Sequence, residues 1–291
     1  MAENRSRTLG PENANTLQYR NNVATMMYRQ ARYPEAEEEL RPILEAEQRT
    51  LGAEHAYTLR TRNDLTAVLM KLGKNAEAEK ESCEILKIYT RGLGPDHQKS
   101  LGARANLAAA LQLQKKYAEA EEEHRTVLEG RMRILGLEHP ETLATRDALA
   151  AVEGSQGRHD EAEKEHRSVL TLRERVLGPE HPETFDTRNN LAGILFVQGK
   201  YAEAKKEQRA VLAIRERVFG AGHPDVFTSC KNLALCLEKQ HKLKEALEFM
   251  RRAETGWTKS LGADNPDTKS AKDARERIEA ALKGEHAAEA I

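Results

Sequence analysis

The chain has 291 residues, and its 46 Lys and Arg residues nearly balance its 47 Asp and Glu residues, which gives a formal net charge of −1. With 39% hydrophobic residues and a mean hydropathy of −0.73, the composition is that of a soluble globular protein. A balanced charge creates no field that would attract nucleic acid or an anionic membrane, so neither is an expected partner. The first ten residues contain no apolar signal-peptide core, and no segment approaches 18 consecutive apolar residues, which predicts a cytoplasmic protein.

The chain contains three cysteines, Cys83, Cys230 and Cys236. An odd number in a chain of this length does not indicate a disulfide framework. Cys230 and Cys236 lie six residues apart on a predicted helix and therefore point to different faces. We expect three reduced thiols that act as small packing residues.

An internal repeat organises the sequence. A Leu-Gly or Phe-Gly pair recurs every 42 residues without insertion, which predicts six repeats and a terminal helix. Counting from the first residue of each pair as slot 1, the repeats span residues 9–50, 51–92, 93–134, 135–176, 177–218 and 219–260. The predicted remainder is a remnant of a preceding helix or a stub at 1–8, a capping helix at 261–284, and a tail at 285–291.

Each repeat is predicted to contain two helices, A and B. Helix A begins where a proline occupies the first helical position, as at Pro182, and ends near Gly199, which suits a left-handed turn. Helix B of the same repeat runs from Tyr201 to Val218, and no segment has the alternating pattern of a strand. Because one pair cannot bury its own apolar stripe, the pairs must stack on their neighbours. In the final helix, Lys283-Gly284 predicts the C-terminal end.

Three columns of the repeat are predicted to be structural. One slot of the inter-repeat loop holds a histidine five times and an asparagine at both ends, which is typical of a helix-capping position: Asn13, His55, His97, His139, His181, His223 and Asn265. Arginine at slot 12 and glutamate at slot 31 recur together and are both replaced in the sixth repeat, by Cys230 and Phe249. This covariation favours an ion-pair ladder between helices A and B. His159, Glu163 and His166 have helical metal-ligand spacing, but His159 occupies a column filled elsewhere by Tyr and His166 repeats His124, so no metal is expected.

The run Gly199-Lys200-Tyr201-Ala202-Glu203-Ala204, preceded by Leu191-Ala192, resembles the core of tetratricopeptide repeats. The 42-residue length and the L-G-x-x-H-P-x-T-L pattern resemble the kinesin light chain subclass of that family. The resemblance implies an all-α fold, a right-handed α-solenoid of antiparallel helix pairs, whose concave wall is built from A helices and binds peptides or proteins. It implies no cofactor and no catalytic residues, and no nucleotide-binding, nucleophile or zinc motif occurs in the chain.

The resemblance also implies that slots 10, 13, 14, 17, 20 and 21 face or border the concave wall. Asparagine dominates slots 13 and 14, although it is a mediocre residue for a helix interior. Its amide can grip the backbone of an extended peptide, and nearby basic residues favour an acidic or carboxylate-ended ligand. The candidate ligand-binding residues are Asn21, Asn22, Arg29, Arg60, Asn63, Lys71, Asn106, Asp147, Asn189, Asn190, Lys231, Asn232 and Lys239. The alternative is that the asparagines bond to a neighbouring helix.

Glu153 occupies a slot that holds Leu or Met in the other repeats. A buried unpaired carboxylate is costly, so we expect either an Arg or Lys partner or a bend that exposes it. Three functions remain open: a protein- or peptide-binding scaffold, which the sequence favours, a sensor array of a signalling ATPase, and a self-assembling structural protein.

Overall fold

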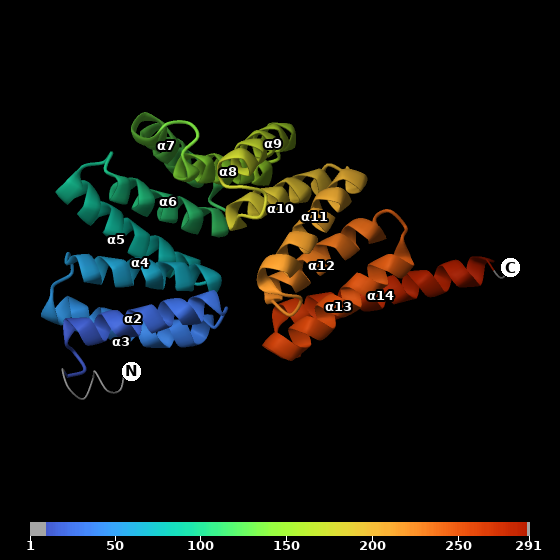
Figure 1. Ribbon diagram of the computed structural model, residues 1–291, viewed down its shortest axis with the longest axis horizontal. Helices are drawn as coiled ribbons and strands as arrows, with labels where there is room; N and C mark the ends of the chain where they lie inside the picture. The colour runs from blue at the N-terminus through green and yellow to red at the C-terminus, as the bar shows by residue number, and fades with distance from the viewer. Residues whose placement is uncertain (1–9, 290–291) are drawn as a thin grey trace. The chain divides into compact units, whose positions relative to one another are not determined.

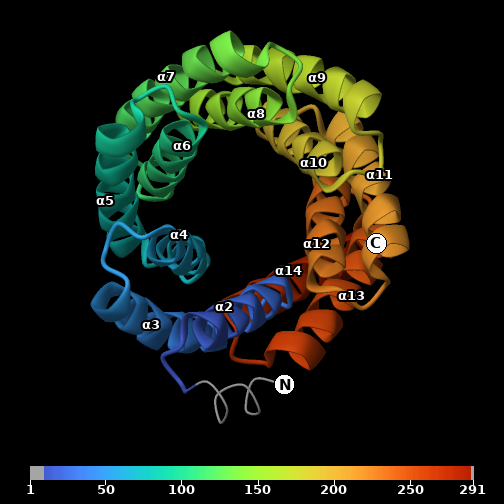
Figure 2. The same ribbon diagram turned by 60° about the vertical axis from the view of Figure 1, so that its left-hand side comes forward.

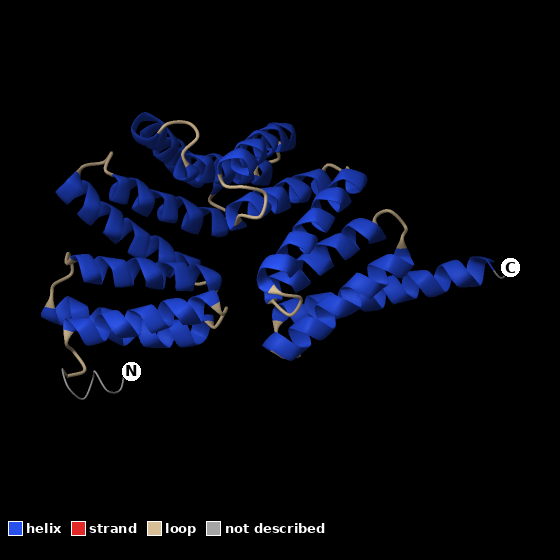
Figure 3. Cartoon of the chain, viewed as in Figure 1, coloured by secondary structure: helices blue, strands red, loops and turns tan. Residues whose placement is uncertain are grey.

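The computed structural model describes residues 10–289, with side chains described up to residue 284. This part of the chain contains thirteen α-helices, labelled α2 to α14, and no strand (Figures 1 and 3). The all-α prediction is therefore confirmed, whereas the predicted remnant at residues 1–8 lies outside the described residues. The chain divides into two compact units, residues 1–152 and 153–291.

The first unit contains α2 to α7 and most of α8. Their bounds are Ala14–Arg29, Tyr33–Thr50, Ala56–Lys71, Asn75–Leu93, Gln98–Leu113, Tyr117–Leu135 and Pro140–Ser155. From α2 to α7, each helix packs against the next, and the A helices α2, α4 and α6 also contact one another in succession. The A helices therefore form one layer and the B helices a second layer, as Figure 2 shows for α4 to α7.

The second unit contains α9 to α14. Their bounds are His159–Val176, Pro182–Val197, Tyr201–Phe219, Pro224–Glu238, Leu243–Leu261 and Pro266–Glu289. The largest apolar core of this unit joins α12, α13 and α14, with Met250, Trp257 and Ile278 almost completely buried. Each helix pair thus buries its apolar stripe against the next pair, as stacking of the repeats requires.

The loop histidines cap the A helices as predicted. In each interior loop the imidazole Nδ1 accepts a hydrogen bond from the backbone N–H two residues later, at 3.1–3.3 Å. Asn13 and Asn265 make the same bond through Oδ1. Each side chain satisfies one of the backbone donors that a helix N-terminus leaves without a partner.

The turn from helix A to helix B places slot 23 in the left-handed region in all six repeats. Gly73, Gly157 and Gly199 occupy it with φ between 74° and 90°. Ala31, Lys115 and His241 adopt the same conformation with φ of 56–63°, which is strained for residues with a Cβ atom. The packing of helix A on helix B therefore overrides the preference of these three residues for a negative φ.

One predicted boundary is wrong. Helix α14 does not end at Lys283-Gly284 but continues to Glu289. Gly284 does not adopt a positive φ, so it forms no left-handed cap. The residues that follow it, Glu-His-Ala-Ala-Glu, are mostly good helix formers that offset the propensity of a single glycine.

The predicted Arg–Glu ladder is present in repeats one, two, three and five. The pairs Arg20–Glu39, Arg62–Glu81, Arg104–Glu123 and Arg188–Glu207 lie 2.5–2.7 Å apart. In the sixth repeat Cys230 is fully buried and Phe249 packs on the same apolar core, so an apolar contact replaces the ionic one. Glu153 is also paired, with its carboxylate 3.5 Å from the Arg158 guanidinium.

Candidate ligand surface on the A helices

The asparagines of slots 13 and 14 form hydrogen bonds between successive A helices. Asn106 Nδ2 donates to Asn63 Oδ1, and Asn232 Nδ2 donates to Asn189 Oδ1, each at 3.3 Å. Asn63 Nδ2 also donates to the backbone oxygen of Leu59 at 2.9 Å. These are the contacts that the structural alternative predicts, so the asparagines stabilise helix stacking whether or not they also bind a ligand.

Two predicted ligand residues do not lie on an accessible surface. Asn21 is fully buried and donates to Thr61 Oγ1 at 3.1 Å, and Asp147 is only 6% exposed. The prediction that these two residues line an open groove is therefore wrong. Asn21 is covered by the A helix of the following repeat, which carries Thr61.

Two of the predicted basic residues already bond to other side chains of their own unit. Arg60 donates to Gln18 Oε1 and Asn22 Oδ1, and Lys231 donates to Ser270 Oγ and lies 5.7 Å from the centre of the Trp257 ring. These two side chains are held by their own unit. The exposed members of the predicted set are Asn22, Arg29, Arg60, Lys71 and Lys239, and the half-buried ones are Asn63, Asn106, Asn189, Asn190, Lys231 and Asn232.

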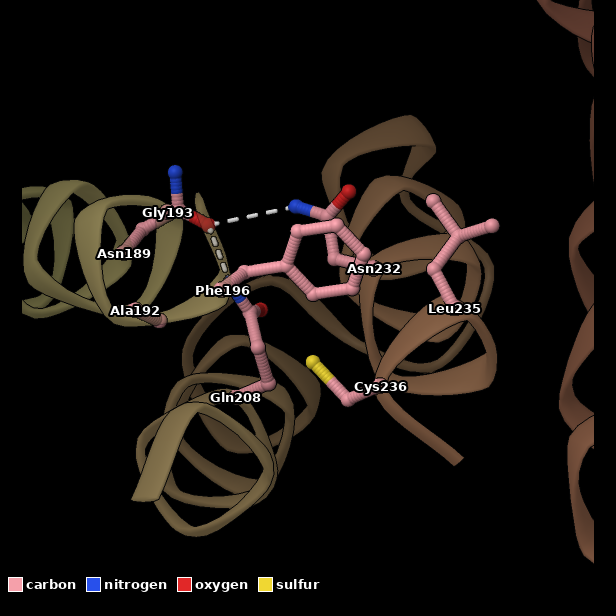
Figure 4. A pocket seen from close by; sticks show the side chains of 8 residues that line it. All are labelled: Asn189, Ala192, Gly193, Phe196, Gln208, Asn232, Leu235 and Cys236. Carbon is pink, nitrogen blue, oxygen red and sulfur yellow. Dashed lines mark hydrogen bonds between the residues drawn. The ribbon is translucent and has the colours of Figure 1, made fainter. Parts of the chain in front are cut away.

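A pocket of about 150 Å³ opens in the second unit, where α10, α11 and α12 meet (Figure 4). It is lined by Asn189, Ala192, Gly193, Phe196, Gln208, Asn232, Leu235 and Cys236. Five of these residues occupy A-helix slots 13, 14, 17 and 20, which the sequence assigned to the ligand-facing wall. The pocket therefore lies between the A helices of the fifth and sixth repeats and reaches helix B.

Amide groups form one wall of this pocket. Asn189 Oδ1 accepts from Asn232 Nδ2 and from Gln208 Nε2, the latter at 3.1 Å, as the dashed lines in Figure 4 show. Phe196 packs edge-to-face on Tyr201, with ring centres 5.3 Å apart. Burial raises the pKa of the Cys236 thiol to about 11, which keeps it neutral near pH 7.

A second pocket, of about 260 Å³, lies in the first unit at corresponding slots. It is lined by Ala24, Thr25, Tyr28, Arg29, Leu40, Asp64, Ala67 and Val68. Burial raises the pKa of the Asp64 carboxyl, and Arg29 stands at the edge of the same pocket. The repeat thus produces the same hollow in both units, charged in the first and lined by neutral amides in the second.

Among the described side chains, which extend from Gly10 to Gly284, no group of three His, Cys, Asp or Glu residues is arranged to hold a metal ion. Glu163 instead contacts Lys200 at 2.7 Å and Arg167 at 2.9 Å, and His166 is fully buried. No described helix is long and apolar enough to cross a membrane.

Stacked antiparallel helix pairs with a fixed repeat length define the class of helical repeat proteins. The tetratricopeptide repeat model matches residues 15–91, 99–175, 148–195 and 183–259. The chain therefore belongs to the tetratricopeptide repeat family. A search of curated proteins gives no match.

Solved structures include similar chains. A Podosopora anserina protein described as a kinesin light chain with nearly identical TPR-like repeats is 25% identical, with a TM-score of 0.53, and the match covers 70% of this chain and 96% of that one. NprR in complex with its cognate peptide NprX is 16% identical, with a TM-score of 0.67, over 93% of this chain and 77% of that one. A Rap protein complexed with competence and sporulation factor is 12% identical, with a TM-score of 0.67, over 97% and 79%. The last two likenesses show the fold alone.

Sequence reasoning missed several pocket residues. Gln208 occupies slot 32 on helix B, where the first and last repeats have Leu40 and Met250. A polar residue in a column that begins and ends with apolar ones was the available signal. Phe196 and Leu235 occupy slots 20 and 17, which were assigned to the wall, but their apolar character did not match the expected polar surface.

Proposed function

We propose that this protein is a non-catalytic scaffold whose A-helix surface binds a peptide or a segment of a partner protein. The observation that carries the proposal is the occurrence of a pocket at corresponding A-helix slots in each unit. The peptide complex of NprR, a protein of similar fold, supports this choice of ligand class. A cytoplasmic location and the absence of nucleic acid as a partner belong to the same proposal.

The chemistry of the surface suits an extended chain. Carboxamide groups can donate to and accept from a peptide backbone without requiring a particular sequence. Arg29, Lys71 and Lys239 present exposed positive charges beside the amide-rich slots. An acidic side chain or a terminal carboxylate is therefore the partner chemistry that these residues favour.

A peptide-display library selected against the intact chain tests the proposal. We expect enrichment of acidic peptides, and Lys71→Ala should weaken a recovered acidic peptide by about tenfold, as loss of a charge-assisted hydrogen bond requires. The difference between parent and variant should shrink with added salt, because screening weakens an exposed charge pair. Titrating a fluorescent peptide measures both effects.

Glu122→Ala, an exposed change on helix α7, is the matched control and should leave affinity unchanged. Failure of the intact chain to enrich any peptide over an unrelated protein would contradict the proposed function. Equal binding by parent and Lys71→Ala would remove Lys71 from the ligand surface.

A further inference from the structure

The pocket at the junction of α2, α3 and α4 is bordered by three side chains that carry oxygen atoms. Thr25 and Tyr28 come from α2, and Asp64 comes from α4. The Asp64 side chain is 33% exposed, and Thr25 and Tyr28 are half-buried, so all three reach accessible space instead of being enclosed by protein. The exposed cation Arg29 stands at the edge of the same pocket. The pocket therefore offers a ligand both hydrogen-bond acceptors and a positive charge.

The negative charge of Asp64 is only partly compensated by its own unit. Arg60 Nε lies 4.0 Å from Oδ2, which is longer than a hydrogen bond, and the Arg60 guanidinium donates to Gln18 and Asn22. Burial raises the pKa of the Asp64 carboxyl and outweighs the Asn21 amide and the Arg60 charge, which lower it. A ligand cation would complete the compensation that these groups leave unfinished.

The other two oxygens of the pocket can accept hydrogen bonds as well. Thr25 Oγ1 donates to the backbone oxygen of Asn21 at 3.0 Å, which leaves its own lone pairs free. Burial raises the pKa of the Tyr28 hydroxyl, which keeps this group neutral. An ammonium group has three N–H donors and no acceptor, so it matches a carboxylate accompanied by two hydroxyls.

The pocket favours lysine over arginine. A guanidinium pairs best with both oxygens of a carboxylate, but Asp64 Oδ2 is enclosed, which leaves one oxygen for a ligand to reach. The remaining lining, from Ala24, Leu40, Ala67 and Val68, is apolar and suits the methylene stem of lysine. The pocket volume of about 260 Å³ exceeds the roughly 150 Å³ of a cavity that holds benzene, so a lysine side chain, which has fewer non-hydrogen atoms, fits.

We propose that this pocket binds a lysine side chain of the partner, with the ammonium group on Asp64, Thr25 and Tyr28. The inference rests on the proposed function and names one side chain of its ligand. Arg29 at the rim opposes a cation inside the pocket and favours an acidic group beside that lysine. The pocket of the second unit has Asn232 and Phe196 at the slots of Asp64 and Tyr28, so it lacks both the carboxylate and the hydroxyl.

The side-chain analogue of lysine, n-butylammonium, tests the inference on the intact chain, with 1-butanol as its uncharged counterpart. At constant ionic strength, we expect n-butylammonium to bind at least about tenfold more tightly in NMR titrations, because hydrogen bonds to charged groups are the stronger ones. The backbone amide signals that shift should belong to residues 24–29 and 64–68, which line this pocket.

Three variants carry residues that other repeats have at the same slots, which favours normal folding. Asp64→Asn, as at slot 14 of the third repeat, should weaken n-butylammonium by about tenfold and leave 1-butanol unchanged. Arg29→Ser, as at slot 21 of the fourth repeat, should strengthen n-butylammonium by removing a like charge. Ala67→Leu, as at slot 17 of the sixth repeat, should block both probes.

Thermal unfolding confirms that each variant is folded, and Glu122→Ala is the control that should bind like the parent. Equal binding of the two probes, unchanged n-butylammonium binding by Asp64→Asn, or signals that shift only in the second unit would each overturn the inference. Its failure is distinct from that of the proposed function. Peptides without lysine that are enriched by the intact chain would leave the scaffold proposal standing while removing the lysine pocket.

Discussion

At the scale of single residues, one column of the repeat uses two different side chains to make the same hydrogen bond in different copies. The capping column shows this clearly, since histidine Nδ1 and asparagine Oδ1 make the same bond to a backbone N–H. Both accept through an atom at a similar distance from the backbone, so the column tolerates either residue. Alanine offers no acceptor and would leave the helix N-terminus uncapped.

We therefore expect His181→Asn to keep the stability of the parent and His181→Ala to lose about 1 kcal/mol. Asn13 and Asn265 are natural examples of the conservative change. Urea unfolding followed by circular dichroism measures both variants. Equal losses for asparagine and alanine would mean that ring packing, rather than the hydrogen bond, stabilises this position.

His124 gives a residue-scale prediction of pH dependence. It is 3% exposed, and neither ring nitrogen has a hydrogen-bond partner. Burial, aided by the positive charge of Arg131, lowers the pKa of His124 from its ordinary value of 6.5 to about 4. Between these pH values the unfolded chain binds a proton that the folded chain does not, so this residue reduces stability as the pH falls through that window.

His124→Leu, with the residue of the same slot in the first repeat, should remove this loss. Between pH 7 and pH 4 the parent should lose more stability than the variant, by up to about 3 kcal/mol. Urea midpoints for both proteins at the two pH values make the comparison. The carboxylates titrate in both, so an identical loss would show that His124 is solvated or paired in the folded state.

At the scale of helices, successive B helices are connected by a recurring ion pair that one repeat lacks. Glu37–Lys74, Glu79–Lys116 and Glu163–Lys200 join slot 29 of one repeat to slot 24 of the next at 2.6–2.9 Å. In the fifth repeat slot 29 is Lys205, and Lys242 beside it lowers the pKa of Lys205. The same geometry therefore holds two like charges together.

Lys205→Glu should replace this repulsion by an ion pair and stabilise the second unit by about 0.2–1 kcal/mol, the range for exposed pairs. The gain should decrease with added salt. Lys206→Glu makes the same charge change on the neighbouring exposed residue and should have little effect. Comparable stabilisation by both variants would attribute the gain to net charge instead of to Lys242.

At the scale of the whole molecule, stability within each unit is distributed over nearest-neighbour interfaces, because successive helices of a unit pack on one another. The chain has one tryptophan, Trp257, which is buried in the core of the second unit. Its fluorescence therefore reports that unit, whereas circular dichroism reports all helices.

Leu69→Ala, which removes a fully buried side chain from the core of the first unit, should cost about 2–5 kcal/mol locally. We expect the urea transition measured by circular dichroism to broaden towards lower urea while the Trp257 transition moves less. Coincident shifts in both signals would show that the two units unfold as one cooperative body.

The sequence by itself determined the helices, their caps and the Arg–Glu ladder. All three depend on residues at fixed slots within one helix pair or at its boundary. A 42-residue period without insertion therefore identifies Pro182 as a helix start, His181 as its cap, and Arg188 with Glu207 as an ion pair.

Tertiary structure alone decided which of those slots are open to a ligand. Asn21 and Asn189 share slot 13, yet the first is covered by the next A helix and the second lines a pocket. The neighbours of the two side chains differ, because Asn21 bonds to Thr61 of the next A helix, whereas Asn189 bonds to Gln208 and Asn232 in the pocket wall. Slot identity fixes where a side chain begins, but the neighbours that pack around it fix whether water or a ligand can reach it.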